Sequence, residues 1–245
     1  MTTKYYILLL FSLFLFISCS SEDKNVDSAE KAFNAAAEID KAERYEEALK
    51  RYQEVRNKYP YSKFAVESQL AIADVYYKQE SFADAQLAYQ NFRDLNPKHT
   101  KIDYVHFQLA MSYFKQLPET IDRDLTLAPS AISLFDEFLK KYPNSQYASD
   151  AKKNRDASFK MLAEKEDYIA NYYFIRDQFE SALARYEVVL KKYSDQGSES
   201  LALSRAAVSA FKAGQKDKAQ KYLATLLQKY PNSEDHSYAE KEMKK

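Results

Sequence analysis

The segment EEALKRYQEVRNKYP, residues Glu46 to Pro60, carries a spacing that recurs along the chain. An alanine, Ala48, is followed four residues later by the aromatic Tyr52 and twelve residues later by Pro60. Four further segments keep this spacing, with leucine once replacing the aromatic and serine once replacing the proline: Ala85, Tyr89 and Pro97; Ala131, Phe135 and Pro143; Ala182, Tyr186 and Ser194; Ala219, Leu223 and Pro231. Repetition of one measured unit indicates a repeat protein.

Each unit is expected to be a pair of antiparallel helices. In the first unit, Ser28 is expected to cap a helix that ends near Ala42, and a second helix should run from Glu46 to about Lys58. A small residue twelve positions before the alanine marks the first helix in four units, at Ala36, Ala73, Ala170 and Ala207. This layout resembles the tetratricopeptide repeat, so the sequence predicts an all-α superhelical array of five tetratricopeptide-like helix pairs.

Two departures from the usual 37-residue spacing predict how the array is divided. Ala85 and Ala131 are 46 residues apart because of an insert at roughly Pro118 to Thr126, between the helices of the third unit. Residues 145–177 contain no glycine or proline and predict one helix of about thirty residues. We therefore expect an N-terminal half of repeats 1–3, residues 28–144, joined through the long helix to repeats 4–5, residues 145–245.

The N-terminus has the pattern of an export signal, which we assign to residues 1–18. A short basic start precedes thirteen uncharged residues, too few to span a membrane. The only cysteine of the chain, Cys19, follows at once, and the preceding residues resemble a bacterial lipobox. We expect Cys19 to be lipidated and residues 19–27 to be a flexible tether. The alternative is a plain signal peptide with a cysteine nearby.

Composition argues against several classes of function. The formal net charge is zero, with 36 basic and 36 acidic residues, so nucleic acid is not an expected partner. Two glycines leave no room for a glycine-rich phosphate loop. The three histidines, His99, His106 and His236, share no metal-ligand spacing, and no hydrolase motif occurs. We therefore expect no enzyme activity, no catalytic residues, no metal ion and no cofactor.

One stripe of apolar residues on the first helices predicts a substrate groove. In stacked helix pairs the first helices line the concave side. An exposed apolar run there would suit an extended peptide with aromatic side chains. The alternative is that the tether or a neighbouring unit covers these residues, which are Phe33, Leu70, Tyr77, Phe107, Met111 and Phe114.

The insert contains the sequence Asp122-Arg123-Asp124. The simpler interpretation makes Asp124 the N-cap of the following helix and Arg123 a solvated loop residue, with Pro129 near the first turn. A loop arginine that can form bidentate contacts is also a candidate partner site. The motif alone leaves both interpretations open.

The order of the parts resembles the BamD family, the lipoprotein subunits of the outer-membrane β-barrel assembly machinery. The resemblance covers essentially the whole chain after the signal and rests on the lipobox, three repeats, the DRD insert, KKYPNSQYASDAKK, the long helix, ANYYFIRDQFESALARYEVVLKKY and a final QKYPNS. It implies an outer-membrane lipoprotein that faces the periplasm and acts as an assembly scaffold.

The same resemblance implies partners and docking residues. The C-terminal repeats would dock on a POTRA domain of the barrel-forming subunit, the N-terminal repeats would meet unfolded outer-membrane proteins, and other assembly lipoproteins would join the complex. The docking residues would be Arg123, Asp124, Tyr172, Tyr173, Arg176 and Arg185. A bland alternative is that Arg176 and Arg185 pair with Glu180 or Glu187 on the surface.

Two other functions remain open from the sequence. One is a periplasmic tetratricopeptide adaptor of the Tol-Pal or cell-division type, although such proteins usually have an N-terminal coiled coil and no lipobox. The other is a lipoprotein adaptor for a cell-wall hydrolase.

Overall fold

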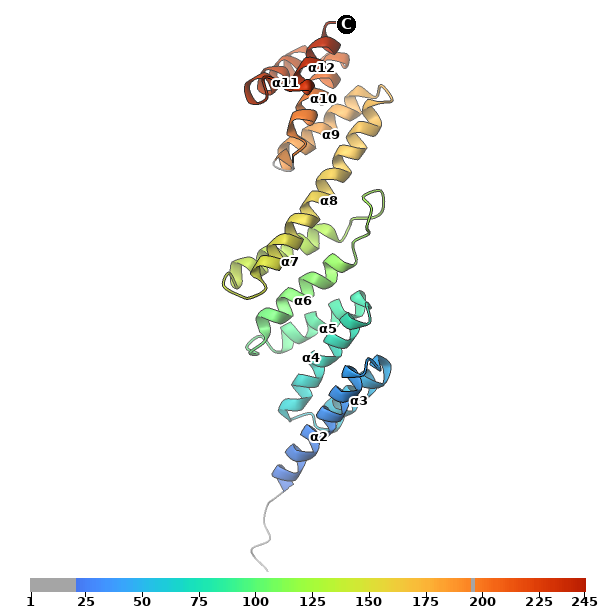
Figure 1. The fold of residues 1–245 in the computed structure, drawn as a ribbon, viewed down its shortest axis with the longest axis vertical. Helices are drawn as coiled ribbons and strands as arrows, with labels where there is room; N and C mark the ends of the chain where they lie inside the picture. The colour runs from blue at the N-terminus through green and yellow to red at the C-terminus, as the bar shows by residue number, and fades with distance from the viewer. Residues whose placement is uncertain (1–20, 195–196) are drawn as a thin grey trace, which may run out of the picture. The chain divides into compact units, whose positions relative to one another are not determined.

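The computed structural model describes residues 21–194 and 197–245, so the expected signal peptide and Cys19 lie outside the described residues. The described residues form eleven helices and no strand (Figure 1). The helices are α2 (Ser21–Lys41), α3 (Tyr45–Lys58), α4 (Lys63–Lys78), α5 (Phe82–Leu95), α6 (Ile102–Lys115), α7 (Ala128–Lys141), α8 (Ala148–Phe174), α9 (Phe179–Lys192), α10 (Glu199–Lys212), α11 (Lys216–Lys229) and α12 (Glu234–Met243).

The chain divides into two compact units, Met1–His99 and Thr100–Lys245, here called unit 1 and unit 2. Unit 1 contains the pairs α2/α3 and α4/α5, and unit 2 contains α6/α7, α8/α9 and α10/α11. The predicted all-α array of five helix pairs is therefore confirmed. Helix α12, which was not predicted from the sequence, packs on α10 and α11 at the end of unit 2.

Alanine at the repeated positions lets the two helices of each pair approach closely. Larger side chains then fill the space between successive helices, as the buried rings of Tyr52, Tyr89, Phe135 and Tyr186 do. The nine repeated alanines have no exposed surface, and neither has Ala110, which takes the corresponding place on α6: Ala36, Ala48, Ala73, Ala85, Ala131, Ala170, Ala182, Ala207 and Ala219. The residues that repeat in the sequence are thus the residues that form the core.

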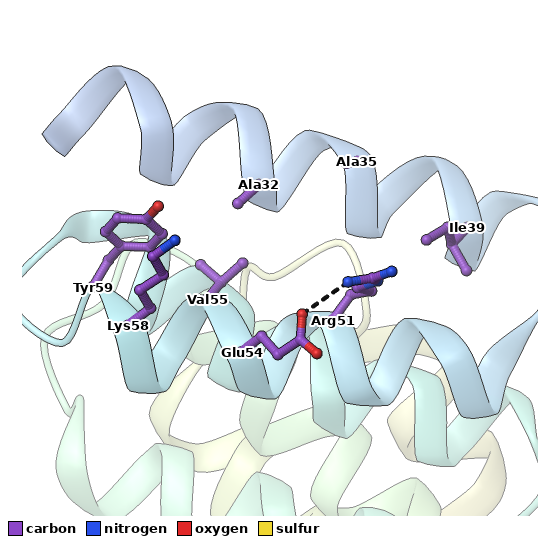
Figure 2. Close-up of a pocket in the computed structure, with 8 residues that line it drawn as sticks. All are labelled: Ala32, Ala35, Ile39, Arg51, Glu54, Val55, Lys58 and Tyr59. Atoms are coloured by element: carbon purple, nitrogen blue, oxygen red, sulfur yellow. Dashed lines mark hydrogen bonds and ion pairs between the residues drawn. The ribbon is translucent and has the colours of Figure 1, made fainter. Parts of the chain in front are cut away.

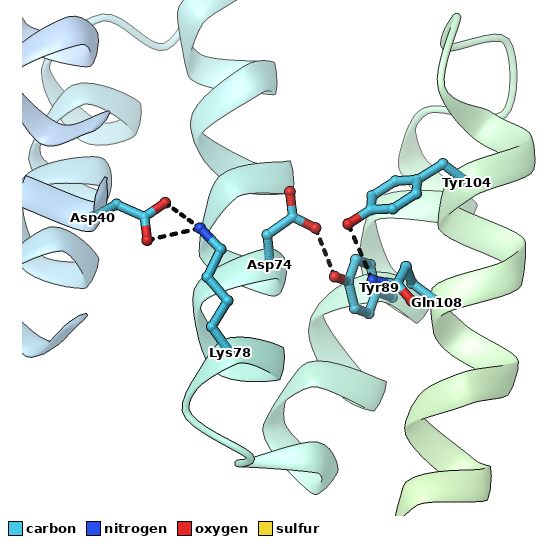
Figure 3. A network of polar contacts seen from close by, with 6 residues as sticks. All are labelled: Asp40, Asp74, Lys78, Tyr89, Tyr104 and Gln108. Carbon is cyan, nitrogen blue, oxygen red and sulfur yellow. Dashed lines mark hydrogen bonds and ion pairs between the residues drawn. The ribbon is translucent and has the colours of Figure 1, made fainter. Parts of the chain in front are cut away.

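Polar contacts tie neighbouring helices together within unit 1 (Figure 3). Lys78 on α4 donates to both carboxylate oxygens of Asp40 on α2, at 2.7 and 2.8 Å. The hydroxyl of Tyr89, whose ring is fully buried, donates to the carboxylate of Asp74 at 2.6 Å. A buried hydroxyl needs such a partner, so the aromatic of the repeat is also a polar anchor. Within α6 of unit 2, Gln108 donates to the hydroxyl of Tyr104 at 3.1 Å.

Four turns between paired helices contain a residue with positive φ. These residues stand at equivalent repeat positions: Glu43 with φ of 58°, Glu80 with 60°, Asp177 with 57° and Gly214 with 77°. Residues with side chains reach this left-handed conformation only at a cost, which glycine avoids. The turn that contains Gly214 is therefore the one of the four in which this cost is absent.

Replacing Gly214 by alanine is expected to lower the free energy of unfolding of unit 2 by about 1 kcal/mol, because alanine must adopt the left-handed conformation. A Cβ atom at this position would meet nothing within 4 Å, so no steric clash contributes. Urea denaturation followed by circular dichroism measures the change. Glu80→Ala is the matched control and should change stability by less than about 0.5 kcal/mol, since both residues carry a side chain. An equal loss in the two variants would refute the explanation.

Several predicted boundaries are confirmed. The long helix α8 has 27 residues, against the expected thirty or so. The insert lies between the end of α6 at Lys115 and the start of α7 at Ala128, with Pro129 in the first turn. Helix α9 ends at Lys192 although serine replaces the usual proline at Ser194.

Two helix starts were predicted wrongly. Helix α2 begins at Ser21, so most of the expected tether is helical, and Ser28 is not its cap. The Ser28 hydroxyl instead contacts Tyr59 and lowers the pKa of that tyrosine. Asp124 does not cap α7, whose N-cap is Leu127 without a side-chain cap.

The division between the compact units differs from the division proposed from the sequence. Residue 145 lies inside unit 2, because α8 packs on both α7 and α9 and joins the third repeat to the fourth. The division into repeats 1–3 and 4–5 therefore stays a proposal about function.

Candidate functional site

Two of the six residues predicted to line the substrate groove belong to the core instead. Leu70 is 2% exposed in unit 1 and Phe107 is 8% exposed in unit 2. The ring of Phe107 stacks on that of Tyr147, with centroids 5.0 Å apart, and lies 5.9 Å from the ring of Phe138. Successive first helices pack closely enough to bury this stripe in part. Leu70 and Phe107 are therefore corrected to core residues.

The other four predicted groove residues are half-buried, and each has an internal neighbour. In unit 1, Phe33 lies 5.5 Å from Tyr52, and the ring of Tyr77 lies 5.2 Å from that of Phe82. In unit 2, the sulfur of Met111 accepts a hydrogen bond from Asn154 at 3.3 Å. The Phe114 ring lies edge-on to Phe135, with centroids 6.3 Å apart. The groove role of these residues stays a prediction.

The C-terminal part of α8 exposes a row of large apolar side chains. Tyr168, Tyr172 and Ile175 are 56%, 44% and 63% exposed, respectively. Their spacing of four and three residues places them on one face of the helix. We call these three residues the α8 stripe. Its length and exposure are typical of a surface that a partner covers.

Of the three stripe residues, Tyr172 was predicted from the sequence as a docking residue, whereas Tyr168 and Ile175 were not. The signal was present in the spacing of these residues, because the core side of α8 is already supplied by small residues such as Ala163 and Ala170. A second apolar row on the same helix, away from that core side, could have been recognised as available for a partner.

Arg176 lies directly beside the α8 stripe. Its guanidinium carbon is 3.7 Å from the centroid of the Tyr172 ring, and the guanidinium donates to the Tyr172 carbonyl at 3.2 Å. Such a cation–π contact holds the ring and the charge in a fixed arrangement. Tyr173, in contrast, is half-buried and packs against the core of unit 2. The structure therefore brings Tyr172 and Arg176 together at the surface and places Tyr173 beneath them.

Arg185, on α9, does not join this cluster. It donates to the carboxylate of Glu166 on α8 at 3.2 Å, so neither Glu180 nor Glu187 is its partner. Glu187 instead accepts from Lys218 and Tyr222, at 2.9 Å each. At 100° per residue, Glu166 lies about 150° round α8 from the centre of the stripe. The Arg185 side chain is 43% exposed, so the pair contributes little to stability.

The insert before α7 is attached to α8. Lys165 donates to the backbone carbonyl of Arg123, whose side chain is exposed. Asp124 accepts from the backbone nitrogen and the hydroxyl of Thr126, at 3.0 and 2.9 Å, and these hydrogen bonds lower its pKa. Lys165 lies one turn before Tyr168 on the same face of α8. The insert therefore lies next to the N-terminal end of the α8 stripe.

A pocket of unit 1, absent from the sequence predictions, lies between α2 and α3 (Figure 2). Helix α2 contributes small and apolar side chains, including Ile39. Helix α3 contributes Arg51, which donates to Glu54 at 3.0 Å. The amine of Lys58 lies 5.5 Å from the centroid of the Tyr59 ring at the end of the pocket. The pocket is thus apolar on one wall and charged on the other.

Two further features are absent from the described residues. No helix among them is both long enough and apolar enough to cross a bilayer. They also contain no cluster of three or more His, Cys, Asp or Glu side chains suited to a metal ion.

The chain matches known proteins over most of its length. The family model described as "Outer membrane lipoprotein", YfiO, matches residues 25–222. The outer membrane protein assembly factor BamD of Neisseria meningitidis is 30% identical over 207 residues, 77% of this chain and 78% of that protein. The factor of the same name from Caulobacter vibrioides is 26% identical over 76% of this chain and 61% of its own.

Solved structures with a similar arrangement of helices are more distant in sequence. The TPR2AB domain of yeast Sti1, in its complex with pHSP90, is 14% identical, with a TM-score of 0.45 over 89% of this chain and 83% of that chain.

Proposed function

Because this chain belongs to the outer membrane lipoprotein family that includes the outer membrane protein assembly factors BamD, we propose that it is a scaffold of the machinery that assembles β-barrel outer-membrane proteins. It docks on the barrel-forming subunit, contacts unfolded substrate and is held to the outer membrane, facing the periplasm, by lipid on Cys19. The family match supports the general role. The exposed α8 stripe beside Arg176 is the observation that carries the docking step.

The α8 stripe has the composition of an interface anchor. Tyrosine and arginine are enriched among the residues that dominate binding energies, because they combine a large apolar surface with polar groups. Here Tyr172 and Arg176 are already held against each other, so little side-chain entropy is lost when a partner covers them. The partner is a POTRA domain of the barrel-forming subunit. The insert, with Arg123 and Asp124, extends the surface at the other end of the stripe.

Affinity capture of the native complex in detergent tests this proposal. A β-barrel protein with POTRA domains, together with further assembly lipoproteins, is the expected result. A Tol component or a cell-wall hydrolase in its place would favour one of the two adaptor functions that the sequence leaves open.

Substrate contact is assigned to the half-buried aromatic residues of the first helices. Tyr77 in unit 1 and Phe114 in unit 2 retain partial exposure and can contact an aromatic side chain of an unfolded barrel protein.

We expect Tyr77→Leu and Phe114→Leu, made separately, each to weaken binding of a peptide from the C-terminus of a barrel protein about twofold, because each removes one aromatic contact of roughly 0.5 kcal/mol. Fluorescence anisotropy of the labelled peptide measures the change. Leu70→Met, a volume-conserving change in the core, is the matched control and should leave binding unaltered. Unchanged affinity in either variant would show that the residue replaced does not contact substrate.

A further inference from the structure

A second groove of unit 1 lies between α3 and α5, over the middle of α4, and uses none of the residues assigned above. It has a volume of about 200 Å³. Its lining residues come from α3, α4 and α5, and we call the parts on α3 and α5 its two walls. The lining residues that carry polar or large apolar groups are Gln53 and Arg56 on α3, Gln69, Ile72 and Tyr76 on α4, and Asp84, Leu87 and Asn91 on α5. We call this the α3–α5 groove.

The polar side chains on the two walls are exposed and can contact a ligand. Within the described part of the chain, Gln53, Arg56, Asp84 and Asn91 make no side-chain hydrogen bond or ion pair. The two amides face the groove from opposite walls, and each offers both donors and an acceptor. A peptide group also offers one donor and one acceptor. Paired amides of this kind therefore match the main chain of a polypeptide.

The main chain of such a ligand must be extended. In a helix the peptide groups are already hydrogen-bonded to one another, and only an extended segment leaves them available. Asp84, Leu87 and Asn91 lie on one face of α5 over two turns, about 10 Å, which is the length of three extended residues. Leu87, 60% exposed, supplies an apolar contact between the polar ends.

Charge gives the groove a direction. Arg56 lies eight residues after the repeated alanine of α3, near the end of that helix, whereas Asp84 lies one residue before the repeated alanine of α5, in its first turn. Because α3 and α5 are equivalent helices of successive repeats and run the same way, the two charges lie at opposite ends of the groove. An extended segment with a basic residue at one end and an acidic residue at the other complements both.

We propose that the α3–α5 groove binds an extended segment of a partner polypeptide through its main chain. The segment carries an acidic side chain beside Arg56, a basic side chain beside Asp84 and an apolar side chain against Leu87 and Ile72. This site goes beyond the scaffold function proposed above, because it needs neither the α8 stripe nor the aromatic residues assigned to substrate.

The test uses two pentapeptides, Asp-Thr-Val-Thr-Lys and the reverse order Lys-Thr-Val-Thr-Asp, each blocked at both termini. The full chain, labelled with ¹⁵N in detergent, is titrated with each peptide while the side-chain NH₂ signals of Gln53 and Asn91 are followed. One order should shift both signals in a saturable way. The same peptide with its three central nitrogens methylated should bind at least tenfold more weakly, because those main-chain donors are gone.

Variants locate the binding in the groove. Gln53→Ala with Asn91→Ala should weaken the preferred peptide at least tenfold, whereas Asn57→Ala, an exposed change on α3 outside the groove, should not. Tyr172→Ala with Arg176→Glu should also leave peptide binding unchanged, which separates this inference from the docking proposal. Binding that survives methylation or the groove variant would overturn the inference, as would the absence of a shift with either order.

Discussion

Replacing Tyr172 by alanine and Arg176 by glutamate together is expected to reduce recovery of the barrel-forming subunit at least tenfold in affinity capture. The two side chains form one exposed unit, with the guanidinium 3.7 Å from the ring centroid. Truncation of a central tyrosine or arginine at an interface typically costs about 2 kcal/mol or more, and about 1.4 kcal/mol corresponds to a tenfold change in affinity. Reversal of the charge adds repulsion if the partner surface is acidic.

The fold should survive this double substitution. Tyr172 is 44% exposed and Arg176 lies in the turn after α8, so neither contributes to the buried core of unit 2. Leu227→Ala with Lys221→Glu is the matched control, because it removes an exposed apolar side chain and reverses a charge on α11. The control should recover the barrel-forming subunit as well as the unaltered chain does. Equal recovery from the α8 variant, or an equal loss in the control, would contradict docking through the stripe.

Cys19→Ser is expected to abolish incorporation of labelled palmitate and to remove the protein from the outer-membrane fraction. Serine lacks the thiol to which the lipid would be attached. The variant therefore loses the acyl chains, of which each buried CH₂ group contributes about 0.8 kcal/mol to membrane binding. The chain as a whole is polar, with a mean hydropathy of −0.61. Metabolic labelling followed by membrane fractionation measures both effects.

Ser18→Ala is the matched control for lipidation. It changes the residue next to the cysteine but leaves the thiol in place, so the label should be retained. Retention of the label by Cys19→Ser would show that another residue carries the lipid, and absence of the label from the unaltered protein would favour a plain signal peptide.

The repeat architecture was predictable because its determinants are local and periodic. Each repeated alanine is enforced by the close approach of two helices, and each repeated aromatic by the space between neighbouring helices. The spacing from Ala48 to Tyr52 and Pro60 therefore predicts two buried residues of the core and the end of the second helix of the pair. The absence of glycine and proline likewise made the long helix α8 predictable.

The surface was harder to predict because periodicity identifies a face without identifying what covers it. Phe107 and Phe114 lie on the same stripe of α6, yet Phe107 stacks on Tyr147 from the start of the next repeat and is buried. Ion pairs between residues far apart in sequence were equally hard to predict. Arg185 reaches Glu166, nineteen residues earlier on another helix, in preference to carboxylates near it in sequence.

The cap of α7 was also predicted wrongly, because the sequence does not show which groups compete for the Asp124 carboxylate. Asp124 was expected to cap α7, but its carboxylate accepts two hydrogen bonds from Thr126, and α7 begins only at Ala128. The docking residues suggested by family resemblance divide in a similar way. Tyr172 and Arg176 meet at the surface, Tyr173 supports them from the core, and Arg185 lies on another side of α8.

Depletion of this protein in its own cells, followed by quantification of folded β-barrel proteins, tests the scaffold function most directly. Heat-modifiable mobility in gels distinguishes folded from unfolded barrels, and inner-membrane proteins serve as the internal control. The proposed function predicts that folded outer-membrane barrels decline several-fold while inner-membrane proteins keep their levels. Normal amounts of folded barrels after complete depletion, in a cell without a duplicate of the gene, would contradict it.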